Sequence, residues 1–176
     1  MEEQKNMLNK GDCVVYGNHG LCEVKDILVP SFLERGNETL YYSMVSSIDS
    51  KGVLYVPVEG AEDKMRDAID ADEAEGLIDD IDELEEYEIP QGKKAEAVIV
   101  DVIKRNNAPE MMCLVKSLRK IKAERAAEGK KFASMDEKYL GIAEKLLYSE
   151  MAYSMEAKMD AVRERVTSEL SQLTLA

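Results

Sequence analysis

The chain has 176 residues, of which 45% are hydrophobic and 34% charged, and its formal net charge is −13 at pH 7. This balance indicates a globular protein of one medium or two small domains, because disordered chains contain fewer apolar residues. The negative net charge excludes a protein that binds nucleic acid over its whole surface. No stretch approaches the roughly 18 apolar residues that a membrane helix needs.

The N-terminal residues, the cysteines and the single histidine limit the cellular compartment and the kinds of site that are expected. Residues 1–5 are polar and acidic, unlike a signal peptide. The chain has three cysteines, which lack the spacing of metal ligands, and one histidine. We therefore expect a cytoplasmic, reduced protein without a membrane segment, a metal site or a cofactor.

The first sixty residues predict short strands separated by turns, a spacing typical of a small barrel-like sheet. Alternating apolar and charged side chains at 21–29 indicate a half-buried strand. Pro57 lacks an amide donor, so the last strand should end there or lie at a sheet edge. The expected strands are residues 13–16, 21–29, 40–45 and 53–58, and the expected turns or breaks are 17–20, 34–38 and 49–52.

After residue 60 the apolar residues recur at helical spacing. Residues 62–88 are expected to form an acidic first helix, and Pro90 and Gly92 break the pattern. Residues 98–103 predict a short helix, although their β-branched content leaves a strand possible. The second half of the chain is therefore expected to be mainly helical.

Helix start and stop signals divide the rest of the chain. A helix is predicted to start with Asn107 or Ala108 near its N-cap and Pro109 in the first turn, and Gly129 should end that helix. Ser134 and Glu137 match a capping box, in which each side chain bonds to a free backbone amide. The helix that opens there could run to the C-terminus.

Charge is distributed unevenly along the chain. Residues 61–90 carry two basic and fourteen acidic side chains, whereas residues 91–131 carry eleven basic and five acidic ones. One interpretation is two solvated helix faces that attract each other, and charge alone favours it. The other is a local basic patch that contacts phosphate while the rest of the chain repels it.

The motifs that usually signal catalysis are missing from the sequence. His19 lies between two expected strands and is interpreted as a turn residue. The carboxylates at 79–83 lack the spacing and the glycine of a calcium loop, and helical periodicity runs through them. The chain contains no GxGxxG, P-loop, HExxH or GxSxG motif. We therefore expect that the protein is not an enzyme.

A more specific pattern lies near the N-terminus. It comprises Gly11-Asp12, Val14-Val15-Tyr16 and His19-Gly20, with Gly17 where a proline is usual. These residues resemble the opening of the CarD family of bacterial transcription regulators. The family shares this module with the RNA-polymerase-interacting domain of transcription-repair coupling factors. Further segments similar to the family are residues 41–42, 54–58, 114–125 and 136–152.

The resemblance implies an α+β protein. A Tudor-like small β-barrel would occupy residues 1–62, followed by an all-α helical domain at 63–176 with an acidic first helix and a basic middle segment. In the family the barrel adds an edge strand to a sheet of the RNA polymerase β subunit. In that mode unpaired backbone groups supply affinity and alternate side chains supply specificity.

The resemblance places the docking edge at residues 27–32, supported by Tyr55 on the neighbouring strand. Ordinary packing of Phe32 and Tyr55 is the alternative interpretation. The implied polymerase-binding residues are Ile27, Val29, Pro30, Phe32 and Tyr55.

In the family the helical domain contacts promoter DNA and inserts a tryptophan wedge beside the melted region, a device that fills an unstacked base step. This chain has no tryptophan, and the corresponding position falls near Gly92. Phosphate contacts alone would be weak and indifferent to sequence, and they would form in the polymerase complex. The implied DNA-binding residues are Lys93, Lys94, Lys104, Arg105, Arg119, Lys120, Arg125 and Lys138, with Lys116 and Lys122 as further candidates.

Two functional hypotheses follow from these patterns. The first is a regulator that binds the polymerase β subunit and tunes the stability of the promoter open complex, which the basic segment 91–131 favours. The second is an interaction module that keeps polymerase binding but lacks productive DNA contact, which the missing tryptophan favours. In the second case the acidic segment 62–88 would bind a basic partner or compete with DNA.

Overall fold

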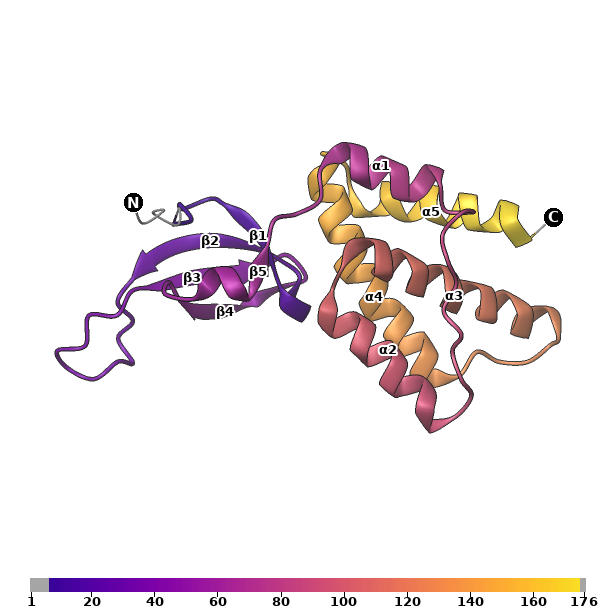
Figure 1. The fold of residues 1–176 in the computed structure, drawn as a ribbon, viewed down its shortest axis with the longest axis horizontal. Helices are drawn as coiled ribbons and strands as arrows, with labels where there is room; N and C mark the ends of the chain where they lie inside the picture. The colour runs from indigo at the N-terminus through magenta and orange to yellow at the C-terminus, as the bar shows by residue number, and fades with distance from the viewer. Residues whose placement is uncertain (1–6, 175–176) are drawn as a thin grey trace. The chain divides into compact units, whose positions relative to one another are not determined.

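The computed structural model describes residues 7–174, which form a β-sheet unit followed by a helical unit (Figure 1). The two compact units are Met1–Ala68 and Ile69–Ala176. This division falls later than the boundary expected after residue 62. The reason is that β5, Met65–Arg66, pairs with the first strand of the sheet and so ties residues 63–68 to the N-terminal unit.

The N-terminal unit is one curled antiparallel sheet with the strand order β4-β3-β2-β1-β5. Within the described residues β4 and β5 do not pair with each other, so the sheet stays open. The chain is thus α+β, while closure into a Tudor-like barrel remains a prediction. The remaining elements of the unit are β1 Cys13–Tyr16, η1 Gly17–His19, β2 Leu21–Leu28, β3 Tyr41–Ser46, β4 Asp49–Pro57 and η2 Ala61–Asp63.

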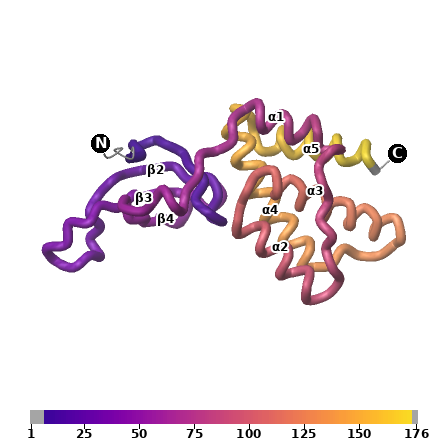
Figure 2. The backbone as a smooth tube through the Cα atoms, viewed as in Figure 1, coloured from indigo at the N-terminus to yellow at the C-terminus, as the bar shows by residue number. Residues whose placement is uncertain are grey.

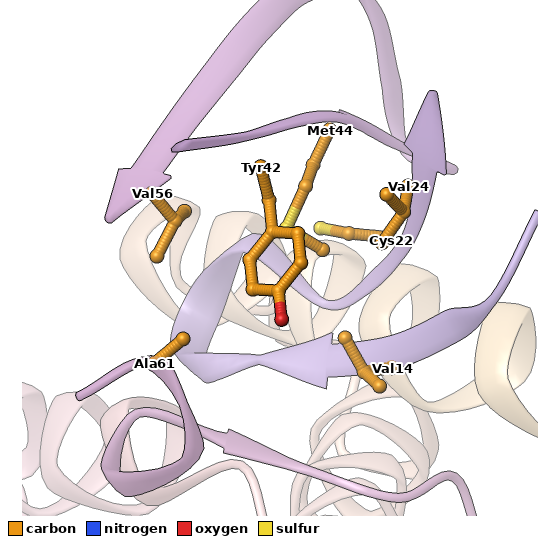
Figure 3. Close-up of a cluster of buried hydrophobic side chains, with 7 residues drawn as sticks. All are labelled: Val14, Cys22, Val24, Tyr42, Met44, Val56 and Ala61. Atoms are coloured by element: carbon orange, nitrogen blue, oxygen red, sulfur yellow. The ribbon is translucent and has the colours of Figure 1, made fainter. Parts of the chain in front are cut away.

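The inner face of the sheet encloses a small apolar core (Figure 3). Its Tyr42 ring lies among the other side chains, and the Tyr42 hydroxyl accepts a hydrogen bond of 3.0 Å from the Leu8 amide. Burial raises the pKa of the Cys22 thiol from 9.0 to about 11, so this thiol is protonated at neutral pH. The core residues are Val14, Cys22, Val24, Tyr42, Met44, Val56 and Ala61.

The hairpin between β3 and β4 is tighter than expected. Residues 49–52 are not a turn but the beginning of β4, because Ser46 pairs with Asp49 across a two-residue loop. The prediction for Pro57 is confirmed: β4 ends at this residue and lies at the edge of the sheet. Proline has no backbone amide to donate, and at an outer edge no neighbouring strand needs that donor.

The helical unit packs its helices around a second core. Two long helices, α3 and α4, supply most of its fully buried side chains. The helices are α1 Ala71–Asp79, α2 Lys93–Arg105, α3 Ala108–Ala127, α4 Ser134–Ser154 and α5 Met159–Thr174. Fully buried large residues on α3 and α4 are Met111, Met112, Leu114, Leu118, Leu146, Leu147, Tyr148 and Met151.

The expected acidic helix at 62–88 is largely wrong. Met65 lies in β5, and α1 covers only Ala71–Asp79. The Asp70 side chain caps α1 by accepting a hydrogen bond from the Glu73 amide. A helix C-terminus carries partial negative charge, so the carboxylates that continue past Asp79 oppose extension of α1.

Local signals define α2 and α3 well. Residues 98–103 are helical, within α2. The Asn107 side chain accepts a hydrogen bond of 3.2 Å from the Glu110 amide, which confirms the predicted N-cap. Gly129 follows the end of α3 with φ of +71° in a Schellman motif, in which the Lys130 amide donates to the Arg125 carbonyl.

The predicted capping box and the single C-terminal helix are both wrong. The N-cap of α4 is Ala133 and makes no side-chain hydrogen bond, so Ser134 lies inside the helix. The helix ends at Ser154 because Glu156 adopts φ of +52° and the Ala157 amide donates to the Ala152 carbonyl, a second Schellman motif. The chain then restarts as α5.

Candidate functional site

The surface of the N-terminal unit carries an aromatic cluster in which Phe32 and Tyr55 are exposed and Tyr41 is half-buried. The Phe32 ring contacts Tyr41 and Tyr55 edge-on, with centroid distances of 5.8 Å and 5.3 Å. Phe32 is 61% exposed and Tyr55 is 44% exposed. Edge-to-face packing accounts for the mutual orientation of the rings but leaves their outer faces in water.

Further apolar side chains are exposed in the same segments. Val53 and Tyr55 are two residues apart on β4, so their side chains point to the same side of the strand. Val29 and Leu40 flank the connection between β2 and β3, which projects beyond the strands (Figure 2). Exposed apolar groups in this number indicate a surface that a partner covers.

The backbone of β4 is open on the side away from β3. The Val58 amide donates to the Leu40 carbonyl at 3.0 Å, which fixes the alternation of the antiparallel ladder. The backbone groups of Val56 and Leu54 therefore face β3, whereas those of Tyr55 and Pro57 face the open edge. Tyr55 thus presents an exposed ring, an amide donor and a carbonyl acceptor at one position.

The edge expected at residues 27–32 is not an edge strand. Ile27 is half-buried within β2, where it pairs with Tyr42, and residues 29–32 lie outside the strand. Pro30 is buried, so it does not present a binding surface. Of the predicted polymerase-binding residues, Val29, Phe32 and Tyr55 are exposed. The signals that point to β4 instead are Pro57 and the alternation of Val53 with Tyr55.

Three of the predicted DNA-binding residues are held by carboxylates of the helical unit. Arg105 pairs with Asp101 and Glu110, which hold the pKa of its guanidinium above its ordinary value. Arg119 donates two hydrogen bonds, of 2.9 Å and 2.8 Å, to the buried carboxylate of Glu144. The Lys120 ammonium lies 2.8 Å from Glu86, whose carboxylate raises the lysine's pKa.

The further candidates Lys116 and Lys122 are also engaged. Lys116 is only 6% exposed, and its ammonium donates to the carbonyls of Asp82 and Leu84. Lys122 lies 3.1 Å from Glu137. Sequence spacing did not reveal these pairs because most of the partners lie far away along the chain.

The other predicted cations are more accessible. Lys93, Lys94 and Lys104 are exposed, and among the described residues no carboxylate lies within ion-pair distance of them. Lys138 lies 5.4 Å from the Tyr139 ring, and Arg125 donates to the Lys131 carbonyl at 3.4 Å. The helix dipole makes the first turn of α2 unfavourable for Lys93 and Lys94, so stability does not explain their place there.

Gly92 stands immediately before α2 as its N-cap, with φ of +78°. A side chain at this backbone conformation is strained, whatever space surrounds it. The backbone at Gly92, near which the resemblance places the family's wedge, therefore favours glycine in this chain. Replacing Gly92 with tryptophan would disturb the start of α2 rather than supply a wedge.

Within residues 7–174, no three histidine, cysteine, aspartate or glutamate side chains gather closely enough to hold a metal ion. None of the helices in that span is long and apolar enough to cross a bilayer. The accessible chemistry of the described surface is therefore that of the aromatic cluster, the β4 edge and the charged helices.

Comparison with protein families matches residues 8–69 to the CarD-like/TRCF RID domain. Comparison with curated proteins gave no match. The family match spans the strands of the N-terminal unit, and the likeness of residues 114–152 to the family's helical domain stays a prediction. Residues 8–69 therefore resemble the CarD-like RNA-polymerase-interacting domain.

Proposed function

We propose that this protein is a non-enzymatic transcription regulator that docks on the RNA polymerase β subunit and alters the stability of the promoter open complex. The open edge of β4 together with the exposed ring of Tyr55 carries the docking half of the proposal. A strand of the partner would pair with the outward backbone groups of β4, and the aromatic cluster would contact its side chains.

The DNA half of the proposal rests on the exposed cations of α2. Lys93 and Lys94 occupy a helix start that disfavours positive charge, and no described carboxylate neutralises them. Such lysines can bind DNA phosphates and so position the protein on DNA without recognising bases. The second candidate, polymerase binding without productive DNA contact, is favoured by the missing tryptophan and by the ion pairs of Arg105, Arg119 and Lys120.

The docking surface can be tested by replacing either exposed ring. We expect Tyr55→Asp and Phe32→Asp to weaken binding to the polymerase β subunit about tenfold or more, because buried aromatic anchors contribute roughly 2 kcal/mol to an interface. Binding would be measured by biolayer interferometry with the immobilised β subunit. Circular dichroism would verify that the sheet is intact in each variant.

A matched control is Tyr153→Asp, which makes the same change at a ring of the helical unit that is 49% exposed. This variant should bind the β subunit as the unaltered protein does. Equal affinity of all three variants and the unaltered protein would show that the aromatic cluster is not the docking surface.

A further inference from the structure

The segment between α1 and α2, residues 80–92, runs across α3 instead of forming a helix (Figures 1 and 2). We call it the acidic strap, because six of its residues are acidic and only Ile81, Leu84 and Tyr87 interrupt their run. The backbone of the strap is held by Lys116 of α3. The Lys116 ammonium donates hydrogen bonds of 3.2 Å and 2.7 Å to the carbonyls of Asp82 and Leu84.

Two more contacts fix the strap to the same side of α3. The Tyr87 amide donates to the Ser117 hydroxyl at 2.8 Å, and Glu86 lies 2.8 Å from Lys120. Positions 116, 117 and 120 are neighbours on one helix face, since residues four apart lie above one another. The strap therefore covers one continuous strip of α3.

This strip borders a groove between α3 and α5 of about 560 Å³. The groove is lined by four cations, Lys116, Arg119, Lys120 and Lys122, and by two carboxylates, Glu86 of the strap and Glu124 of α3. A groove rich in positive charge fits an anionic partner. Within this lining, Lys120 is paired with the Glu86 carboxylate of the chain itself.

The contacts differ in how readily an external anion can replace them. Lys120 and Glu86 have side chains that are 49% and 39% exposed, so their pair contributes little free energy and is screened by salt. The Glu144 partner of Arg119 is 7% exposed, and removing Arg119 from it would leave a buried charge. Lys120 is therefore the exchangeable cation that the strap holds, and Lys122, whose pair with Glu137 is similarly exposed, is exchangeable as well.

We infer that the acidic strap is an internal competitor that holds the basic face of α3 closed against the phosphates of promoter DNA. This inference rests on the proposed function, because it regulates the same DNA contact. DNA phosphates would displace Glu86 from Lys120 and join the contacts made by Lys93 and Lys94. The strap thereby sets a threshold, so that free DNA binds weakly and DNA presented at high local concentration binds well.

The strap is tested by comparing Glu86→Gln with Glu83→Gln in the full chain. Both changes remove one negative charge from the strap, but only Glu86 contacts α3. Affinity for a fluorescent DNA duplex would be measured by anisotropy at several salt concentrations. Glu86→Gln should bind about two- to fivefold more tightly at low salt, and its log–log salt slope should steepen by about 0.9. Glu83→Gln should give no more than the small gain due to net charge.

Two further variants separate release of Lys120 from other causes. In a Lys120→Gln background, Glu86→Gln should give no gain beyond that of Glu83→Gln, because the cation to be released is gone. Ser117→Ala removes the acceptor of the Tyr87 amide without changing any charge, and it should also tighten DNA binding.

The inference is overturned if Glu86→Gln and Glu83→Gln bind DNA equally, including the case in which neither binds measurably at low salt. It is also overturned if the gain of Glu86→Gln persists in the Lys120→Gln background. These measurements use free DNA and no polymerase. The proposed function is tested separately, by the promoter-bubble lifetime in the polymerase complex. An unchanged lifetime would contradict the proposed function but would not affect the strap result.

Discussion

At the scale of single residues, the helical unit contains two classes of charged pair with different consequences. Glu144 is a buried carboxylate on α4 that is bonded by Arg119 from α3, and Arg163 from α5 lies 3.9 Å away. It therefore joins three helices. Lys120 and Glu86, by contrast, lie in solvent. The charge of Arg119 thus stabilises the fold, whereas the charge of Lys120 can exchange its partner.

Arg119 is expected to act on stability. Arg119→Met would leave the buried Glu144 without its bidentate partner, at a cost of about 3 kcal/mol in the free energy of unfolding. The double variant Arg119→Met/Glu144→Leu should recover most of this loss, since neither charge then remains buried. Urea unfolding followed by circular dichroism measures both. Unchanged stability of Arg119→Met would show that the pair is dispensable.

At the scale of elements, the helix boundaries follow from backbone geometry at a few positions. Schellman motifs follow both α3 and α4, with the positive-φ position at Gly129 after α3 and at Glu156 after α4. Glycine adopts positive φ without strain, whereas a glutamate does not. The start of the helical unit is held in a different way. The Ile69 amide donates to the buried Glu150 carboxylate at 2.9 Å, and Ser154 donates to the Ile69 carbonyl.

Two helix starts should respond differently to alanine. Asn107→Ala removes the side-chain acceptor of the Glu110 amide and should lower the free energy of unfolding by about 1 kcal/mol. Ser134→Ala should change it by less than about 0.5 kcal/mol, because Ser134 is inside α4 and caps no amide. Urea midpoints of the two variants give the comparison. A larger loss for Ser134→Ala than for Asn107→Ala would contradict the cap assignment.

At the scale of the whole molecule, net charge would govern the DNA contact that the proposed function requires. Residues 69–90 contain eleven acidic and no basic side chains, and the whole chain carries a net charge of −13. Long-range repulsion therefore weakens binding to free DNA, and physiological salt screens it only partly. Docking of the N-terminal unit on polymerase would raise the local concentration of α2 at the promoter and offset this repulsion.

The effect on the open complex should depend on the two cations that open α2. Lys93→Glu/Lys94→Glu should reduce the change that the protein makes in promoter-bubble lifetime, measured with polymerase at two salt concentrations. The exchange places acidic residues at a helix start, which favours the helix, so loss of function would not reflect unfolding. The difference from the unaltered protein should shrink as salt rises.

Lys145→Glu/Lys158→Glu is the matched control, because both lysines are exposed and the change in net charge is the same. It should leave the bubble lifetime as the unaltered protein sets it. If the two double variants behave alike at both salt concentrations, Lys93 and Lys94 do not contact the DNA.

Local sequence determined a good part of this protein. The N-terminal strands, the edge position of Pro57, the cap at Asn107 and the stop at Gly129 each depend on neighbouring residues, whose conformational preferences act over a few positions. The pattern at residues 8–24 likewise predicted a resemblance to the CarD-like RNA-polymerase-interacting domain, which the family match at residues 8–69 confirms.

Tertiary structure decided which strand is the free edge and which cations are free. Ile27 and Tyr55 both lie in apolar stretches of the sequence, but strand order places Ile27 on an inner strand paired with β3 and leaves Tyr55 on the edge strand. Lys116 and Lys94 both look like solvated cations, yet a segment more than thirty residues away in sequence covers only Lys116. Burial and charge pairing depend on contacts between distant segments, and no local preference encodes those contacts.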